Sequence, residues 1–133
     1  MTRFVPAVRA FALLVAAAVL GGASLPTALA GGGEWSISTN ATGMNGAKHC
    51  LADAAILTQW EHRRAHCTRV VLSGTQERAD VQYTCTGGGF GNSKVQVLTP
   101  RSVRIQTQGI ANGLPFGYTI HARKIGPCPV VKR

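Results

Sequence analysis

The four cysteines of this chain have the most easily identified chemistry. Cys50, Cys67, Cys85 and Cys128 stand far apart and form no C-x-x-C pair, a spacing that does not suit a zinc site. In an oxidising compartment, the thiols of a small domain become disulfide bonds. Four cysteines allow three pairings. We favour Cys67–Cys85 across a hairpin and Cys50–Cys128 between a helix start and the last strand, each bond contributing roughly 3–4 kcal/mol.

Histidine is the second residue type that could bind a metal. His62 and His66 are four residues apart and would share one face of a continuous helix, as in zinc and copper sites, with His49 as a third ligand. There is no H-E-x-x-H motif, and Arg63 and Arg64 would repel a cation. We therefore expect solvated histidines at a helix end, with no bound metal and no other cofactor.

The residues of known catalytic motifs are missing. The chain has no G-x-S-x-G sequence for a nucleophile elbow. The glycine-rich stretch 87–94 ends in Lys94 followed by Val95, whereas a phosphate-binding loop requires Lys followed by Ser or Thr and then a helix. The acids after residue 30 show no paired spacing; they are Glu34, Asp53, Glu61, Glu77 and Asp80. We expect no enzymatic activity, with a hydrolase built from dispersed residues as the second alternative.

Five aromatic side chains could line a ligand pocket between a sheet and a helix. They are Trp35, Trp60, Tyr83, Phe116 and Tyr118. The simpler interpretation is that they form the core. The pocket interpretation gives the first alternative function, a small carrier for an apolar ligand.

The N-terminus has the pattern of an export signal. Arg3 and Arg9 precede an apolar run from Ala10 to Leu20, and Ala28-Leu29-Ala30 fits a small-x-small cleavage site. The run is shorter than the ~20 residues that span a bilayer, so we expect no transmembrane segment after cleavage. This predicts a signal peptide over 1–30, one disulfide-linked, β-rich domain over 31–133, and a periplasmic or secreted location.

The rest of the chain must build the scaffold for these residues. Alternating polar and apolar residues predict strands, and apolar residues at helical spacing predict a helix from Ala52 to Arg64. The predicted strands are Glu34–Thr39, Thr68–Ser73, Arg78–Cys85, Ser93–Leu98, Ser102–Gln108 and Phe116–Lys124. The expected fold is mainly antiparallel β (α+β): one curled meander sheet or partial barrel of about six strands, packed against one helix. Whether the Trp35 strand pairs with the last strand stays open.

Antiparallel registers can be chosen that keep the apolar residues on one face. They pair Tyr83 with Val95, Val95 with Ile105, and Ile105 with Tyr118. The opposite face is then polar and basic, with Gln82, Gln96, Arg104 and Thr119 in one row and Thr84, Lys94 and Gln106 in the next.

The first hairpin fits this scheme less simply. Placing Cys67 opposite Cys85 sets Arg69 beside Tyr83 on the inner face. Shifting the register by one residue pairs Val70 with Tyr83 but separates the cysteines. A β-bulge would reconcile the two demands.

Several segments resemble a known family. They are Gly33-Glu34-Trp35, Met44, Cys50-Leu51 before a short helix, Cys67 and Cys85 around a hairpin, and the closing run Ala-Arg-Lys-Ile-Gly-Pro-Cys over 122–128. Over residues 33–128 the chain resembles the domain of unknown function family numbered 3617, small exported proteins of Gram-negative bacteria. The resemblance implies a periplasmic domain with paired cysteines and no established activity, and it supplies no catalytic residues. The helix here is richer in Arg and His than the acidic helix usual in that family.

The charge of the chain bears on its partner. It carries 14 Lys and Arg against 5 acids, a net charge of +9. Loss of Arg3 and Arg9 with the leader leaves 12 against 5, or +7. Such a surface favours anionic partners, although scattered charge also serves solubility. We expect a non-enzymatic exported domain whose partner is unknown and could be an anionic lipid or envelope polymer. Export and the lack of a stacking surface argue against nucleic acid.

Overall fold

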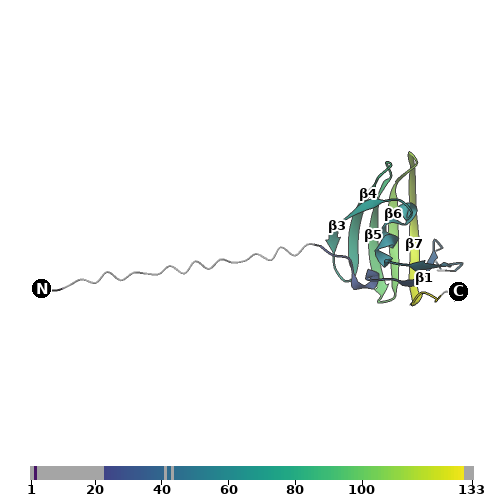
Figure 1. Cartoon of the computed structure of the whole chain (residues 1–133), viewed down its shortest axis with the longest axis horizontal. Helices are drawn as coiled ribbons and strands as arrows, with labels where there is room; N and C mark the ends of the chain where they lie inside the picture. The colour runs from purple at the N-terminus through teal and green to yellow at the C-terminus, as the bar shows by residue number, and fades with distance from the viewer. Residues whose placement is uncertain (1, 3–22, 41, 43, 131–133) are drawn as a thin grey trace.

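Seven antiparallel strands form one open sheet. The structure is a computed structural model that describes residues 2, 23–40, 42 and 44–130. The strands are β1 (Gly33–Ser38), β2 (Ala47–Leu51), β3 (Cys67–Gly74), β4 (Arg78–Cys85), β5 (Phe90–Thr99), β6 (Ser102–Ala111) and β7 (Leu114–Gly126). Their order across the sheet is β2-β1-β7-β6-β5-β4-β3 (Figure 1). The antiparallel, mainly β fold predicted from the sequence is therefore confirmed, and the sheet does not close into a barrel.

One strand was not expected from the sequence. β2 pairs with β1, with His49 opposite Trp35. Its residues, Ala-Lys-His-Cys-Leu, are mostly exposed. The strand was not predicted because an edge strand with so little apolar burial shows no clear alternation of polar and apolar residues. β1 in turn pairs with β7, which answers the open question about the Trp35 strand. The sheet therefore has the predicted strands and β2 in addition.

The hairpin turns decide the registers between strands. Val95 pairs with Ile105, as predicted. Tyr83 pairs with Gly91 rather than Val95, and Ile105 pairs with Ile120 rather than Tyr118. Both predicted registers were wrong by an even number of residues, so every side chain keeps its predicted face.

Tight turns explain these two shifts. Asn112 and Gly113 both have positive φ (52° and 76°) and form a two-residue turn that joins Ala111 to Leu114, the geometry that such residues favour. Likewise, Gly87 and Gly88 have positive φ. β5 can then begin at Phe90, earlier than the alternation of the sequence indicated.

The first hairpin keeps the register that pairs its cysteines and has a β-bulge near its turn. Cys67 pairs with Cys85 and Arg69 with Tyr83, and the register shifts between Val71 and Ser73. A β-bulge is present, but it lies after Val71, so Val70 pairs with Gln82 and not with Tyr83. The bulge predicted from the sequence, which would have brought Val70 opposite Tyr83, was therefore wrong in position. The Arg69 guanidinium donates to Gln59 Oε1 at 2.6 Å, which satisfies its charge-bearing head with an amide on the adjacent helix.

The helix is shorter and tighter than predicted. η2 (Ala54–His62) is a 3-10 helix, and its backbone leaves the helical region at Gln59 (φ −129°, ψ 39°). Asp53 caps it by accepting from the Ala55 N–H at 3.0 Å, which satisfies an otherwise unpaired donor of the first turn. The predicted range Ala52–Arg64 was therefore too long at both ends.

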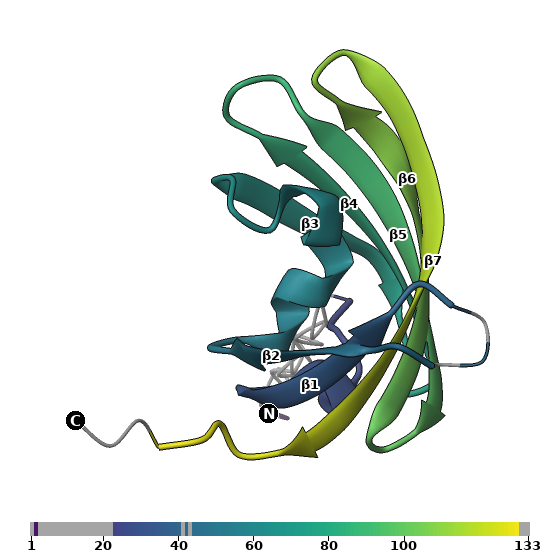
Figure 2. The same ribbon diagram turned by 90° about the vertical axis from the view of Figure 1, so that its right-hand side faces the viewer.

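The core lies between the inner face of the sheet and η2. The sheet bends around the helix, which contacts β4, β5 and β6 (Figure 2). The interior is filled by apolar side chains that are less than a tenth exposed; among them are Trp35, Leu57, Val81, Val95, Val103, Ile105 and Ile120. Two buried hydroxyl residues on the inner face bridge to η2: Ser93 Oγ donates to the Thr58 carbonyl at 2.6 Å and lies 2.9 Å from Thr107 Oγ1.

A short N-terminal segment also belongs to this core. η1 (Thr27–Leu29) is a single 3-10 turn that precedes β1, and Leu29 is only 2% exposed. Residues 3–22, the basic and apolar parts of the predicted leader, lie outside the described residues. No helix in the described part of the chain is long and apolar enough to cross a membrane.

Each edge strand of the sheet carries one disulfide bond. Cys50–Cys128 joins β2 to the segment after β7, and Cys67–Cys85 crosses the β3–β4 hairpin. These are the two pairings favoured from the sequence. The bonds link residues 78 and 18 positions apart, so both restrict the unfolded chain, the longer loop somewhat more.

Candidate functional site

The outer face of the sheet carries a row of polar and basic side chains that crosses four strands. Arg78 on β4 is opposite Gln96 on β5, Gln96 is opposite Arg104 on β6, and Arg104 is opposite His121 on β7. The Arg104 guanidinium donates to the Gln96 side-chain oxygen. We call these four residues the basic row. Neighbouring strands lie ~4.8 Å apart, so the backbones at Arg78 and Arg104, two strands apart, are separated by roughly 10 Å.

The neighbouring row adds one cation and one acid. Asp80, Lys94, Gln106 and Thr119 face one another across β4 to β7. The Asp80 carboxylate accepts from the Asn92 amide at 2.7 Å. A shallow depression of about 360 Å³ lies between the two rows and is lined by Arg78, Lys94, Arg104 and their polar neighbours.

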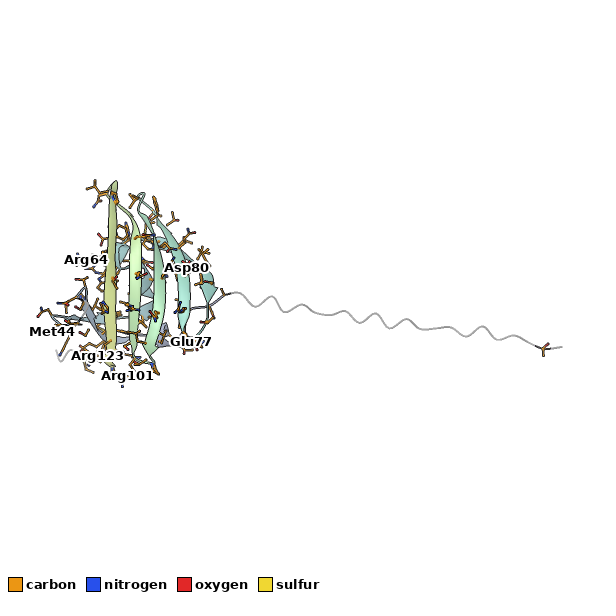
Figure 3. All side chains as sticks on the ribbon, turned by 180° about the vertical axis from the view of Figure 1, so that it is seen from behind. Met44, Arg64, Glu77, Asp80, Arg101 and Arg123 are labelled. Carbon is orange, nitrogen blue, oxygen red and sulfur yellow. A yellow bond between two sulfur atoms is a disulfide. The ribbon has the colours of Figure 1, made fainter. Side chains whose placement is uncertain are left out.

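More positive charge lies on the far side of the basic row. Arg123 on β7 is opposite Ser36 on β1, which is opposite Lys48 on β2. A second depression of about 360 Å³ is lined by His121 and Arg123, with Met44 and Leu98 at its apolar side. Figure 3 shows this outer face, with Asp80 and Arg123 labelled on opposite sides of the sheet. The predicted polar, basic face is therefore present, but with different residues sharing each row.

The five aromatics named as a candidate pocket divide into two groups. Trp35, Tyr83 and Trp60 are buried, at 1%, 2% and 7% exposure, and Trp35 and Trp60 belong to the core cluster. Phe116 and Tyr118 are half-buried on β7, with ring centroids 6.0 Å apart. In the described part of the chain, Trp35, Tyr83 and Tyr118 line no surface depression.

His62 joins two of these aromatics at the end of η2. Its Nδ1 lies 2.8 Å from the Tyr83 hydroxyl, and its ring meets Tyr83 and Phe116 edge-on. Gly91 makes the arrangement possible, because a Cβ there would lie 2.6 Å from the Tyr83 hydroxyl oxygen. Burial, and then the charge of Glu61, raise the pKa of Tyr83 to about 12.

The second tyrosine is bound to the same helix end. The Tyr118 hydroxyl donates to Glu61 Oε2 at 2.8 Å. Burial, and then this hydrogen bond to the carboxylate, raise the pKa of Tyr118 above its ordinary value. Both tyrosines therefore stay protonated at neutral pH. They serve as fixed hydrogen bonds that lock η2 to the inner face of the sheet.

The three histidines named as weak metal candidates do not meet. The ring of His49 packs edge-on against Trp60 with centroids 5.0 Å apart, while His62 bonds Tyr83. Because η2 ends at His62, His66 does not continue the same helical face. In the described part of the chain, no three His, Cys, Asp or Glu side chains are placed to hold a metal ion.

Trp60 forms the floor of a third depression, between η2 and β2. The hollow measures about 410 Å³ and is lined by apolar Leu51 and Ile56 as well as Trp60. The Arg63 guanidinium carbon stands 4.4 Å from the centre of the Trp60 ring. This stacking uses the cation to cover the indole, so it stabilises the helix end.

Two members of the basic row had not been named from the sequence. Arg78 opens β4, and His121 lies two residues before the basic doublet of β7. Both had the correct face in the alternation, but the predicted registers placed Gln82 and Thr119 in their stead. A two-residue turn at Asn112-Gly113 fixes the register that places His121 opposite Arg104, so this turn was the signal that could have identified His121.

Comparison with known proteins gives no relative for this arrangement. No protein-family model, curated protein or solved structure matches the chain. Its resemblance to the family numbered 3617 accordingly stays a prediction from the sequence.

Proposed function

We propose that this protein is a non-catalytic domain of the cell envelope that binds an extended anionic polymer across the outer face of its sheet. The observation that carries the proposal is the basic row, in which Arg78, Gln96, Arg104 and His121 follow one another over four strands. Two disulfide bonds support a location outside the reducing cytoplasm.

The spacing of the charges favours a polymer with repeating carboxylate or phosphate groups. Arg78 and Arg104 project from the same face two strands apart, and Lys94 stands between them in the neighbouring row. Guanidinium groups form directed, paired hydrogen bonds with such anions, and Gln96 adds an amide between the two arginines. A chain that crosses the strands would therefore meet several partners in turn.

The shape of the sheet favours a flexible polymer over a flat membrane. Because the sheet bends around η2 (Figure 2), the outer face is convex. A flat bilayer would contact only part of the basic row, whereas a flexible chain can follow the curve. Attraction of this exposed kind is screened over about 8 Å at physiological salt.

Titration with polygalacturonate, a polymer of acidic sugars, tests the proposal. The protein should bind it at low salt, and the affinity should fall at physiological salt. Replacing both Arg78→Gln and Arg104→Gln should weaken binding roughly fivefold to thirtyfold, which corresponds to about 1–2 kcal/mol for two exposed cations. Neutral dextran should not bind.

A matched control removes the same charge elsewhere. The double variant Arg63→Gln and Arg64→Gln lies at the end of η2, away from the outer face, and should bind polygalacturonate within about twofold of the unchanged protein. Equal losses in both double variants would show that only net charge matters. Binding to anionic lipid vesicles but not to the polymer would replace this proposal with a membrane-binding one.

The carrier alternative has less support. Its site would be the space between the sheet and η2, and Trp35, Leu57 and Val81 fill that space at 1% exposure or less. Native mass spectrometry of the purified protein would reveal a retained apolar ligand.

A further inference from the structure

The segment just before β1 is built into the core. Leu29 is 2% exposed, and Pro26 is among the side chains that are almost fully buried. Leu25 and Ala28 pack against the same core cluster. Burial of this kind is what holds a segment in a folded domain, and it is not expected of a peptide that is cut away.

Hydrogen bonds hold the same segment at both ends. The Thr27 N–H and hydroxyl both donate to Gln76 Oε1, at 3.0 and 2.7 Å. The Ala54 N–H, at the start of η2, donates to the Gly31 carbonyl at 2.8 Å. The segment therefore connects the turn between β3 and β4 to the first residue of η2.

The strand end beside this segment is shaped to receive it. Gly74 closes β3, and a Cβ there would collide with the carbonyl oxygen of Ser24. Gly32 is similarly close to the backbone carbonyls of Leu51 and Ala52, 2.7 Å from a Cβ at that position. Gly74 thus makes room for the backbone at Ser24, and Gly32 lets the end of the same segment pass close to the residues before η2.

We propose that the export signal ends at Ala23, so that the mature protein begins at Ser24 and keeps the segment 24–32. The sequence Gly21-Gly22-Ala23 lies directly after the apolar run. It places small residues, Ala23 and Gly21, at the first and third positions before the cut, where a signal peptidase requires them. The peptidase adds water across the Ala23–Ser24 amide, leaving a carboxylate on Ala23 and a free amine on Ser24. Cleavage after Ala30, which the sequence also allows, would remove Leu29 from the core.

Two crossed substitutions test this assignment in the full-length precursor, exported by a bacterial host. The N-terminus of each product is read by intact-mass measurement and N-terminal sequencing. The unchanged protein should begin at Ser24. Ala23→Leu places a large side chain at the required small position, so the Ser24 product should be lost and the precursor should accumulate. Ala30→Leu should still give a product that begins at Ser24, because Ala30 is exposed.

The reversed pattern would overturn the proposal. A product that begins at Gly31 and is blocked by Ala30→Leu alone would place the cut after the buried segment, and any other terminus would also contradict it. The proposal rests on export, which is part of the proposed function, but not on polymer binding. A Ser24 terminus without binding to polygalacturonate would therefore contradict the proposed function alone, while a precursor that is never cut would contradict export and the cleavage site together.

Discussion

The two faces of the same sheet use polar residues in opposite ways. On the inner face, Ser93 and Thr107 are at most 3% exposed and satisfied by each other and by η2. On the outer face, Arg78 and Lys94 point into solvent beside shallow depressions. Most buried polar groups have hydrogen-bond partners, whereas exposed cations remain available for a ligand. This difference predicts that substitutions on the inner face alter the stability of the protein, whereas substitutions on the outer face alter its binding of the polymer.

The largest effect is expected for an inner apolar residue. Ile105 is completely buried, so Ile105→Ala should lower the free energy of unfolding by about 2–5 kcal/mol through lost burial and a new cavity. Urea denaturation measures this change. Polygalacturonate affinity, measured at a temperature where the variant is folded, should stay within about twofold. A stability change below about 1 kcal/mol would contradict the assignment of Ile105 to the core.

A smaller loss is expected for the inner polar pair. Ser93→Ala removes the bond to the Thr58 carbonyl and takes away the neighbour of the Thr107 hydroxyl, so unfolding free energy should fall by about 1–3 kcal/mol. Ser36→Ala on the outer side of β1 is the matched control and should change it by no more than about 0.5 kcal/mol. Equal effects at the two serines would remove the contrast between the faces.

The two inner-face tyrosines should make the stability of the protein depend on pH in the alkaline range. Tyr83 and Tyr118 are the only two tyrosines in the chain, and burial is the first cause of both raised pKa values. The unfolded chain ionises near pH 10, so the stability they contribute is complete below pH 10 and is lost as pH rises through about 12, the pKa of Tyr83. Tyrosinate absorbance of the folded protein should appear well above pH 10, and an ordinary titration near 10 would contradict their locked state.

The smallest effect on stability is expected for Arg104, the residue before Ile105 in the sequence. Arg104 precedes it on β6 but points outward, so Arg104→Ala should change unfolding free energy by no more than about 0.5 kcal/mol. The same variant should weaken polygalacturonate binding roughly fivefold, or about 1 kcal/mol. A stability loss as large as that of Ile105→Ala would show that Arg104 is structural.

Particular residues show where prediction from the sequence succeeded. Val95 and Ile105 alternate with polar neighbours over long strands, so their common face and their pairing were predictable. Cys67 and Cys85 flank one hairpin, so their pairing was predictable, whereas the β-bulge of this hairpin lies nearer its turn than the predicted one. The polar, basic character of the outer face followed from the same alternation, because a period of two assigns faces without knowledge of the exact register.

Other residues show where such prediction stopped. His121 joined the basic row only once the Asn112-Gly113 turn had set the β6–β7 register. His49 lies on an edge strand that has no apolar alternation, so the strand itself was not predicted. Leu29 resembled part of a cleavage motif, and nothing local distinguishes such an alanine-rich stretch from a segment that packs into the core.

The sequence by itself determined the antiparallel sheet and the two faces of its strands, because these depend on alternation along the chain. It also favoured both disulfide pairs, because Cys67 and Cys85 flank one hairpin and their pairing leaves Cys50 for Cys128. The tertiary structure decided which cations share a row, how Tyr83 and Tyr118 are held by η2, and that Leu29 fills the core. Those outcomes depend on turn geometry and on contacts between residues distant in the chain. Such contacts form only when the whole sheet bends around its helix.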